Sequence, residues 1–560
     1  MRKIIIAVVL LGILFAAAIP TVQTERYDAV IYGGGFAGCA AANSAASLAP
    51  GKKILLIIPE PVNLPGGLGT IGGQNFTDIR YWRERLVTQG SFGLWFNQAG
   101  QFYNTEDMAG IIKKDLDRHP GLRIIYGHDL KDVKVKKGQG ISRLKLVPVE
   151  KNSEGLLEWK SGQLLVRGAV YLDASDDGRL SRLAGVPLAV GRQDWPTRYL
   201  DSEEITTGVY RQQAATLMFK VRGVKTPSEP AQVGEWFFSR DHNGSWGLAG
   251  GQETWSSDAV VTAFNEKYAP SGFSIKPINA AQNGSGSDEW WVNTLLIYHV
   301  DARAQSRDKG TAHYPKDTLP GRRAVDEAWT AARGFLQNPE FMEALRRFRV
   351  RADGQVYGFA EAELVLDEQG LPAVGEVLYL RESVHSLLAE KIPRTENENS
   401  AFAVTMAEAQ KAGPNSSAGA DAENYPDRIG LGYYMMDINA YQPEDLKKSG
   451  DYVWPVTGIV RPDWREGGGE PENPVYLPYR MLLAAGVDNL LIPGYAAGCS
   501  SFAWAELRVL PNQAVFGDAA GVAAARALQY EEKLADFGPE QIGWVQEKLK
   551  GMSARIDKEL

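Results

Sequence analysis

The sequence predicts an α/β fold in which a Rossmann-like dinucleotide-binding domain is joined to a second domain. Two observations indicate this fold. A complete strand–turn–helix–strand unit with spaced glycines occupies residues 27–58, and a later strand runs into a turn of small residues and carboxylates at 173–178. With 560 residues, the chain is long enough for two domains and a large core.

The first unit begins with a short apolar strand at 29–32 (Ala-Val-Ile-Tyr), which is typical of a buried parallel strand. Residues 39–49 are nearly all small and compatible with a helix, which Pro50-Gly51 ends. A second apolar strand follows at 53–58. The free N–H groups and the dipole of the helix predict a phosphate-binding turn where the helix begins.

Three glycines between the strand and the helix have the spacing of a dinucleotide turn. Gly33 permits the tight turn, Gly35 lets a pyrophosphate approach the backbone, and Gly38 lets the helix pack closely on the strand. The alternative is a glycine-rich turn in an unrelated α/β protein. An acidic residue usually ends the second strand and binds the ribose hydroxyls. Here Ile58 takes that place, and Glu60 is the nearest carboxylate.

Charge and cysteine content exclude several classes of protein. The net charge is −8 and no basic run follows residue 3, which argues against a nucleic-acid-binding protein. Two cysteines, Cys39 and Cys499, are too few for an iron–sulfur cluster, and the six histidines show no ligand pattern. We therefore predict no metal site.

The first residues have the pattern of a targeting segment. A basic start, Met1-Arg2-Lys3, precedes an uninterrupted apolar run at 4–19 that contains small residues suited to cleavage. We interpret residues 1–24 as a signal peptide or an N-terminal anchor, so that the protein is exported to a periplasmic or extracellular location or tethered to a membrane through 4–19. A buried N-terminal strand or helix is the alternative.

The next segments are predicted from local patterns. Glycines crowd residues 65–75, which indicates backbone pressed against a ligand, with a mobile surface loop as the alternative. Residues 80–86 and 105–118 are predicted helices, the second with a capping pattern that starts at Thr105. The alternation of residues 122–172 predicts antiparallel strands.

The second half of the chain carries further helices and loops. Residues 320–348 are predicted as a helix with an apolar face, and 511–528 as an alanine-rich helix with proline in its first turn. The tail at 538–558 is predicted as an amphipathic surface helix. Polar stretches at 396–425 and 461–474, rich in glycine and proline, are interpreted as loops near the mouth of the site.

Three separated segments resemble the FAD-dependent oxidoreductase family, which has a glutathione-reductase-like FAD fold and is related to the fumarate-reductase flavoproteins and the flavin subunit of heterodisulfide reductases. They are Gly33-x-Gly35-x-x-Gly38 with the loop at 66–70, then Leu172-Asp-Ala-Ser-Asp-Asp-Gly178, and finally Asn489-Leu-Leu-Ile-Pro-Gly494 followed by 511–521. Segments 379–383 and 477–480 also resemble the family. Asp176 stands where the family usually has glycine, and Tyr495 where it often has arginine.

The resemblance implies a discontinuous, Rossmann-like FAD-binding domain with an inserted α+β substrate domain. The implied division is a first FAD-binding segment at 25–200, a substrate or cap domain at 201–375, a second FAD-binding segment at 376–530 and a C-terminal helix at 531–560. FAD is the implied cofactor. The residues implied to bind it are Gly33, Gly35, Phe36, Ala37, Gly38, Glu60, Gly66, Gly67, Thr70, Leu130, Asp173, Ala174, Asp177, Gly178, Gly494, Asn512, Gln513, Gly517 and Gly521.

The resemblance places segments 381–383 and 479–480 beside the flavin. The candidate catalytic residues come from these two segments and from other parts of the chain. They are Arg381, His385, Asp437, Tyr479 and Arg480, with Asn439 nearby. An arginine can hold a substrate carboxylate or oxyanion, and a histidine or tyrosine can move a proton. For each residue taken singly, a structural ion pair or hydrogen bond is the alternative.

Seven of the fourteen tryptophans fall in residues 191–375, the candidate substrate region: Trp195, Trp236, Trp246, Trp255, Trp290, Trp291 and Trp329. Core packing is one interpretation, and stacking against a sugar or aromatic substrate is the other, with Asp288-Glu-Trp-Trp291 as the most suggestive place.

The function expected from these features is that of an FAD-dependent oxidoreductase. It would take a hydride or electrons from an organic small molecule, sugar-like or aromatic, and pass them to an unknown acceptor. Two alternatives stay open. One is a nicotinamide-dependent dehydrogenase that uses only the first motif, and the other is a secreted carbohydrate-binding protein that retains flavin without turnover.

Overall fold

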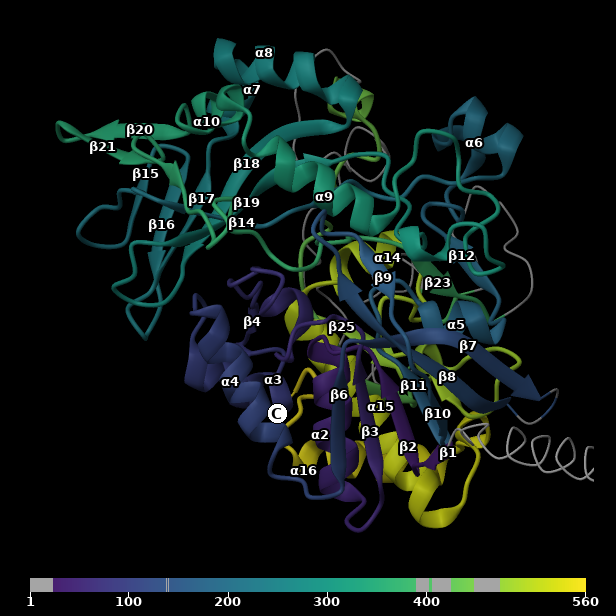
Figure 1. Ribbon diagram of the computed structural model, residues 1–560. Helices are drawn as coiled ribbons and strands as arrows, with labels where there is room; N and C mark the ends of the chain where they lie inside the picture. The colour runs from purple at the N-terminus through teal and green to yellow at the C-terminus, as the bar shows by residue number, and fades with distance from the viewer. Residues whose placement is uncertain are drawn as a thin grey trace, which may run out of the picture.

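The computed structural model describes residues 24–136, 138, 140–388, 402–404, 425–447 and 474–559 (Figure 1). Except for Thr24, the predicted targeting segment at 1–24 lies outside these residues. So do almost all residues of the two loops predicted at 396–425 and 461–474.

A five-stranded parallel sheet forms the centre of the lower part of the molecule in Figure 1. Its strands, in spatial order, are β26 (Leu490–Leu491), β11 (Val170–Asp173), β2 (Ala29–Tyr32), β3 (Ile54–Ile58) and β6 (Leu122–Tyr126). The carboxyl ends of β2 and β11 are direct neighbours, because Asp173 pairs with Tyr32. The two turns predicted to bind the ligand therefore begin at the same edge of the sheet.

Each face of the parallel sheet is covered by a different layer. Ala29 and Ile31 of β2 pack with the helices, whereas Val30 and Tyr32 pack against a second sheet, as expected from the period of two in a strand. The second sheet contains β1 (Thr24–Arg26), β7 (His128–Lys136), β8 (Gly140–Lys151), β9 (Leu157–Trp159) and β10 (Leu164–Arg167).

The helical layer contains two helices that are far apart in sequence, α2 (Phe36–Leu48) and α15 (Leu510–Tyr530). Nearly every residue of both helices is buried, which accounts for their alanine-rich composition. Other helices of the described chain are α3 (Ser91–Ala99), α4 (Thr105–Leu116), α5 (Arg179–Ala184), α6 (Ser202–Thr207), α14 (Ser501–Leu507) and α16 (Pro539–Gly551).

The inserted region forms an eight-stranded sheet of antiparallel pairs, in the upper part of Figure 1. Its strands are β13 (Ala215–Thr216), β14 (Phe219–Arg222), β15 (Ala231–Val233), β16 (Trp236–Arg240), β17 (Trp246–Gly250), β18 (Phe273–Gln282), β19 (Trp290–Ile297) and β22 (Glu363–Leu364). Its helices are α7 (Gln252–Ser257), α8 (Ala259–Tyr268), α9 (Val325–Phe335) and α10 (Pro339–Leu345). The predicted α/β class with a Rossmann-like unit is confirmed.

Shorter antiparallel ribbons lie outside these sheets. They are β12 (Leu188–Val190) with β23 (Val384–Ser386), β20 (Arg349–Ala352) with β21 (Gln355–Gly358), and β24 (Arg428–Gly432) with β25 (Val475–Pro478).

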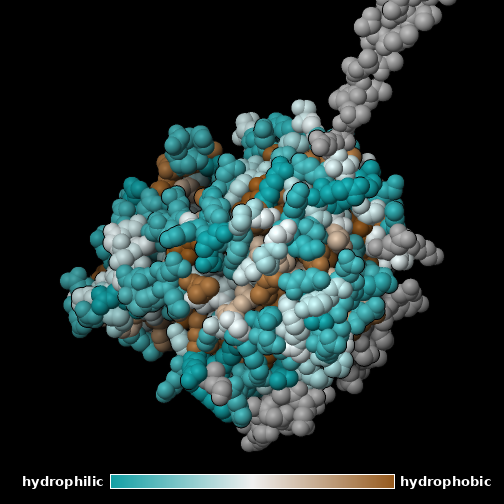
Figure 2. All heavy atoms as spheres, turned by 90° about the horizontal axis from the view of Figure 1, so that it is seen from below, coloured by the Kyte–Doolittle hydropathy of each residue, from teal (hydrophilic) through white to brown (hydrophobic). Residues whose placement is uncertain are grey.

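Hydrophilic side chains cover most of the lower face of the molecule, and apolar side chains show only in small areas between them (Figure 2).

The helix predicted at 80–86 is wrong. Strands β4 (Tyr81–Trp82) and β5 (Arg85–Leu86) form a tight hairpin, and its two turn residues, Arg83 and Glu84, have φ angles of 50° and 61°. A two-residue hairpin of this twist usually carries asparagine or glycine at these positions. Because Arg83 and Glu84 are not typical turn residues, the sequence gives no indication of this hairpin.

Three other predictions need correction. The helix predicted at 320–348 is two helices, α9 and α10, because Asn338 caps a new helix that begins at Pro339. Helix α4 is capped by Asn104, which accepts hydrogen bonds from two backbone N–H groups, and not by Thr105. In the region 122–172, predicted as antiparallel, β6 and β11 are parallel strands of the central sheet.

Candidate active site

The dinucleotide turn joins β2 to α2, and its three glycines are required for different reasons. A Cβ on Gly33, whose φ is +111°, would lie 2.5 Å from the Ala174 backbone. A Cβ on Gly38 would lie 1.9 Å from the carbonyl oxygen of Gly33. A Cβ on Gly35 would meet nothing within 4 Å. Gly33 and Gly38 therefore allow close packing inside the protein, whereas Gly35 leaves open space beside the turn.

The glycine-rich loop that follows β3 is fixed against this turn. The Gly66 N–H donates to the carbonyl oxygen of Gly34 at 2.7 Å, and a Cβ on Gly67 would lie 2.9 Å from the Cα of Gly35. The Thr70 hydroxyl donates to the carbonyl oxygen of Pro65 at 2.7 Å, so it stabilises the loop from within. The loop is therefore an ordered part of the site, and the alternative of a mobile surface loop is not supported.

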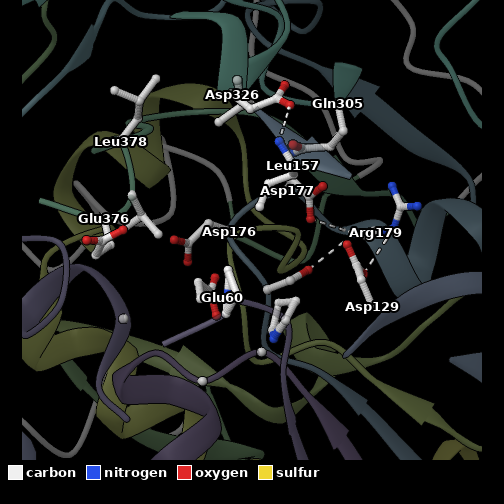
Figure 3. A pocket seen from close by; sticks show the side chains of 18 of the residues that line it. Glu60, Asp129, Leu157, Asp176, Asp177, Arg179, Gln305, Asp326, Glu376 and Leu378 are labelled. Atoms are coloured by element: carbon white, nitrogen blue, oxygen red, sulfur yellow. Dashed lines mark hydrogen bonds and ion pairs between the residues drawn. The ribbon is translucent and has the colours of Figure 1, made fainter. Parts of the chain in front are cut away.

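A cavity opens beside the dinucleotide turn. We call it the dinucleotide cavity; its lining includes Gly35, Glu60, Gly67, Ala174, Asp176 and Asp177 (Figure 3). It encloses about 1030 Å³, counting the open space at its mouth, which is ample for a cofactor. Residues from the inserted domain, Gln305 and Trp329, line it as well. Among the predicted cofactor residues, Gly33 also reaches this lining.

Two carboxylates point into the dinucleotide cavity next to one another, Glu60 and Asp176 (Figure 3). Burial raises the pKa of Glu60 to about 7. Burial, together with the charge of Glu60, raises the pKa of Asp176 to about 7. The Oε2 atom of Glu60 is buried and has no hydrogen-bond partner in the described part of the chain. A hydroxyl donor of a ligand would satisfy it.

Behind this pair, buried ion pairs join the two domains. Arg179 lies 3.3 Å from Asp129 and 2.6 Å from Asp308 of the inserted domain, and Arg307 pairs with Asp129 from the same domain. Burial opposes ionisation of Asp129, but Arg307 and Arg179 outweigh it and lower the pKa of that carboxyl. These residues could not be selected from the sequence, because ion pairs between distant segments leave no local pattern.

Asp173 stabilises the carboxylate-rich turn after β11 through hydrogen bonds. Asp173 accepts hydrogen bonds from the backbone N–H groups and hydroxyls of Ser175 and Ser181, and it does not line the cavity. The Gly494 N–H donates to the carbonyl oxygen of Asp173 at 3.0 Å. Gly178, with φ of +61°, begins α5. These three residues shape the turn and do not line the cavity, whereas Asp177 and Ala174 do. The cofactor role predicted for the three stays a prediction.

Two glycines predicted to bind the cofactor, Gly517 and Gly521, lie where two helices meet closely. A Cβ on Gly517 would lie 2.1 Å from the carbonyl oxygen of Ala37, and a Cβ on Gly521 would lie 2.4 Å from that of Ala41. The four-residue spacing places both glycines on the face of α15 that packs on α2. In the first turn of α15, the Asn512 side chain donates to the carbonyl oxygen of Glu506 at 3.2 Å.

Three other residues predicted to contact the cofactor also make contacts within the protein. The ring of Phe36 packs edge-on against Trp95 at 5.4 Å between centroids, inside the core. Ala37 is buried between α2 and α15. The N–H of Leu130 donates to Asp129, and its carbonyl oxygen accepts from Arg179. Neither Phe36, Ala37 nor Leu130 lines the dinucleotide cavity.

A second cavity lies between the domains. This interdomain cavity is lined by the segment 74–80, by Tyr379, Arg381 and Asp437, and by strands β16 to β19 of the inserted sheet. It encloses about 1310 Å³, counting the open space at its mouth. Leu378 and Leu380 line the dinucleotide cavity, whereas Tyr379 and Arg381 line the interdomain cavity. One short segment therefore separates the two cavities.

Two of the predicted catalytic residues, Arg381 and Asp437, meet in the interdomain cavity together with Asn439. Asp437 is ion-paired with Arg508 at 2.7 Å, and Arg508 also donates to the hydroxyl of Tyr379. Arg381 is 2% exposed and donates from Nη1 to the carbonyl oxygen of Ala214 at 2.7 Å. Burial lowers the pKa of Arg381 to about 10.

Sequence reasoning missed other ionisable groups of this cavity, among them Lys276 and Asp78. Burial, with the charge of Arg381, lowers the pKa of Lys276 to about 7, and burial raises that of Asp78. The hydroxyl of Tyr434 donates to Asp78 at 3.1 Å. A lysine within a strand pattern looks like an ordinary solvated residue, so no local signal selects Lys276.

The other three predicted catalytic residues line neither cavity. The Tyr479 hydroxyl donates to the carbonyl oxygen of Leu534 at 3.0 Å, and its ring stacks on Phe537. Arg480 pairs with Asp427 at 2.6 Å. These contacts correspond to the structural alternative for both residues.

His385 is fully buried on β23, and its ring lies 5.6 Å from that of Trp504. Neither ring nitrogen has a hydrogen-bond partner among the described residues, and the Nε2 atom lies 3.8 Å from Glu382. The structure therefore separates His385 from Arg381 and Asp437.

Most tryptophans of the inserted region are core residues. Trp195, Trp236, Trp255, Trp290 and Trp291 are each at most 6% exposed, which supports the packing interpretation. Trp329 differs because it lines the dinucleotide cavity and donates from Nε1 to the carbonyl oxygen of Gly375 at 2.7 Å.

Within the described residues, no three histidine, cysteine, aspartate or glutamate side chains are placed to share a metal ion. In the same part of the chain, no helix combines the length and the apolar character needed to cross a membrane. Cys39 and Cys499 are both buried and unbridged.

The chain was compared with known proteins. Its sequence matches no curated protein. Among solved structures, it is similar to a geranylgeranyl bacteriochlorophyll reductase-like protein from Thermoplasma acidophilum (11% identity, 94% of this chain and 84% of that chain, TM-score 0.34). It is also similar to a myxobacterial chondrochloren halogenase (13%, 65% and 66%, TM-score 0.30) and to p-nitrophenol 4-monooxygenase from Pseudomonas putida (12%, 50% and 69%, TM-score 0.25).

The family model for FAD dependent oxidoreductases matches residues 28–549, which is nearly the whole chain. The residues around the dinucleotide cavity fit this cofactor: Gly35 leaves space where a pyrophosphate approaches, and the unpaired Glu60 oxygen can accept from a ribose hydroxyl. The chain belongs to the FAD-dependent oxidoreductase family.

Proposed function

We propose that this enzyme transfers a hydride or electrons between a small organic substrate in the interdomain cavity and FAD whose adenosine diphosphate half lies in the dinucleotide cavity. The observation that carries the proposal is the segment 378–381, whose side chains line the two cavities alternately. Substrate pockets often form at domain interfaces, and here the interface lies next to the cofactor domain.

Several residues of the chain would hold the cofactor. The first-turn N–H groups of α2 have no side-chain cap, because the N-cap residue is Gly35, and they are available to a phosphate. Glu60 would accept from the ribose. In the first turn of α15, the Nε2 atom of Gln513 is buried without a hydrogen-bond partner in the described part of the chain, and it would donate to a cofactor oxygen. When bound, FAD supplies the capacity to accept and return a hydride or single electrons.

Residues of the interdomain cavity would hold the substrate. Arg381 and Tyr379 present a cation and a phenol from the segment that adjoins the cofactor domain. Phe76, Phe102 and Tyr434 supply apolar surface that excludes water. The aromatic side chains suit a substrate with an aromatic or apolar body, and the amides of Asn279 and Asn293 in the same lining can bind its polar substituents.

Of the two alternatives, a nicotinamide-dependent dehydrogenase does not agree with the family to which the chain belongs. A carbohydrate-binding protein that retains flavin without turnover is distinguished by its inability to reduce the bound flavin. We further propose that the protein is exported, through the pattern of residues 1–24, and that it passes electrons to an acceptor of unknown identity.

The experiment is anaerobic mixing of the FAD-loaded chain with pools of organic acids, alcohols, amines and sugars, followed by flavin absorbance. The proposal expects at least one pool to bleach the flavin, and it expects Arg381→Ala to retain FAD while bleaching more slowly. The substitution Lys220→Met, which changes a lysine paired with Glu289 outside this cavity, is the control and should bleach normally. The flavin-retaining alternative would be favoured if the protein kept FAD but no pool bleached the oxidised flavin and no pool restored the colour of the reduced flavin.

A further inference from the structure

We propose that the interdomain cavity binds its ligand through a carboxylate held by Arg381 and Lys276, so that the substrate is a small organic acid with an apolar or aromatic body. The inference rests on the proposed function and specifies its substrate class. Three features support it: the charges of the cavity, the surroundings of the two cations and the apolar part of the lining.

The charges that line the cavity are unbalanced. Three basic side chains, from Arg80, Lys276 and Arg381, and two acidic side chains, from Asp78 and Asp437, line it. Asp437 is already paired with Arg508, which lies behind the lining and is 1% exposed at its side chain. An anion entering the cavity therefore meets an excess of positive charge.

Arg381 is the clearest sign of an anion site. Its guanidinium is almost completely buried and lies 4.6 Å from the ring centroid of Tyr379. Its Nη1 atom donates to a carbonyl oxygen, but its Nε atom has no hydrogen-bond partner in the residues that the structure describes. Burying a cation that has no direct ion pair among the described residues is costly, so a bound carboxylate would stabilise this arginine.

Lys276 is brought to the cavity by an irregularity in the sheet. The pairing of β18 with β19 shifts register between Ile275 and Asn279, and Pro277 lies inside the shifted stretch. A bulge of this kind redirects a side chain, and bulges are frequent beside active sites. The hydroxyl of Thr294 donates to the carbonyl oxygen of Lys276 at 2.5 Å and fixes the bulge.

Lys276 is only 2% exposed, and burial together with the positive charge of Arg381 lowers its pKa to about 7. Two buried cations that repel one another are both stabilised by the same anion. A carboxylate has two oxygens with several acceptor positions, so one group can accept from both side chains. Its arrival would favour the charged form of Lys276.

The apolar part of the lining predicts the body of the ligand. Phe76, Phe102 and Leu248 are apolar, and Phe237, which is 52% exposed, lies at the edge of the cavity. These side chains suit an aromatic or branched aliphatic group and leave a simple inorganic anion without contacts.

The test uses the full-length, FAD-loaded chain and isothermal titration calorimetry with sodium benzoate, with benzamide as the neutral probe of the same shape and with inorganic phosphate as the anion without an apolar body. We expect benzoate to bind at least tenfold more tightly than benzamide or phosphate, and more weakly as chloride is raised. Arg381→Met and Lys276→Met should each weaken benzoate by about ten- to a hundredfold, as expected for hydrogen bonds to charged groups. Arg381→Lys should retain part of the affinity, and Lys220→Met on the same sheet should retain all of it.

Equal binding of benzoate and benzamide, or no benzoate binding by a protein that holds FAD, would overturn the inference and leave the proposed function standing. Tighter binding of phosphate than of benzoate would overturn the apolar body. Loss of FAD from folded Arg381→Met and Lys276→Met, with folding checked by circular dichroism, would assign both residues to the cofactor and also overturn the inference. A wild-type chain that cannot be loaded with FAD would instead contradict the proposed function.

Discussion

Replacing Gly35 by alanine should weaken FAD binding without destabilising the apoprotein. Gly35 has φ of −70°, which any residue adopts, and a Cβ there would meet nothing within 4 Å. Because alanine also restricts the unfolded chain, the unfolding free energy of the apoprotein should stay constant or rise by about 0.4–1 kcal/mol. The added methyl group would, however, occupy the space that the pyrophosphate needs, so FAD affinity should fall at least tenfold.

Replacing Gly38, in the same turn, by alanine should have the opposite effect on the stability of the apoprotein. Its Cβ would lie 1.9 Å from the carbonyl oxygen of Gly33 and 3.0 Å from the carbonyl carbon. Backbone atoms cannot move away as a flexible side chain can. The apoprotein should therefore lose about 1–3 kcal/mol of unfolding free energy, the range typical of overpacked sites, or more.

Both variants are measured by denaturant unfolding of the apoprotein and by titration with FAD. Gly110→Ala is a matched control, because Gly110 is exposed on α4 and a Cβ there also meets nothing within 4 Å. If Gly35→Ala and Gly110→Ala bound FAD equally, the pyrophosphate would not lie against Gly35. If Gly35→Ala unfolded as easily as Gly38→Ala, the assignment of open space to Gly35 would be refuted.

Three further predictions concern other parts of the chain. Gly521→Ala would bring a Cβ to 2.4 Å from the carbonyl oxygen of Ala41 and should cost about 1–3 kcal/mol of unfolding free energy. The control Gly543→Ala, in open space on α16, should cost little. Equal losses of unfolding free energy in the two variants would refute the close contact between α15 and α2. Burial raises the pKa of Asp176 to about 7 from an ordinary 3.8, so the folded protein binds the extra proton between these values and its unfolding free energy should fall as pH rises from about 4 to about 7. Asp176→Asn should remove part of this decline, and an unchanged slope would contradict the raised pKa of Asp176. Residues 1–25 fused to a reporter that is active only after export should give activity, and cytoplasmic retention would show that the apolar run at 4–19 does not direct export.

Features that depend on neighbouring residues along the chain could be predicted from the sequence. Strand β2 occupies the residues expected for the first strand, 29–32. Helix α2 begins earlier than the expected helix at 39–49, because its first residue is Phe36. The alanine-rich composition of α15 indicated a helix, and the helix is present from Leu510. Glu60, selected as the nearest carboxylate to the end of β3, lines the cavity.

Features that depend on contacts between distant segments could not be predicted in the same way. Gly517 and Gly521 resembled ligand-binding glycines, and only the position of α2 shows that they permit helix packing. Tyr479 and Arg381 were equal candidates in the sequence, yet one hydroxyl bonds to Leu534 in the core and the other side chain lines a cavity. Lys276 reaches that cavity through a bulge in β18, which is a property of strand pairing.

The most direct test of the account is a crystal structure of the FAD-loaded protein, in which the position of the adenosine diphosphate half is measured. The account predicts the pyrophosphate against Gly35, a ribose hydroxyl donating to Glu60 and an interdomain cavity beside Arg381 that remains open to substrate. An adenosine diphosphate half that fills the interdomain cavity, or that leaves Glu60 without contact, would contradict the division of the site into a cofactor cavity and a substrate cavity.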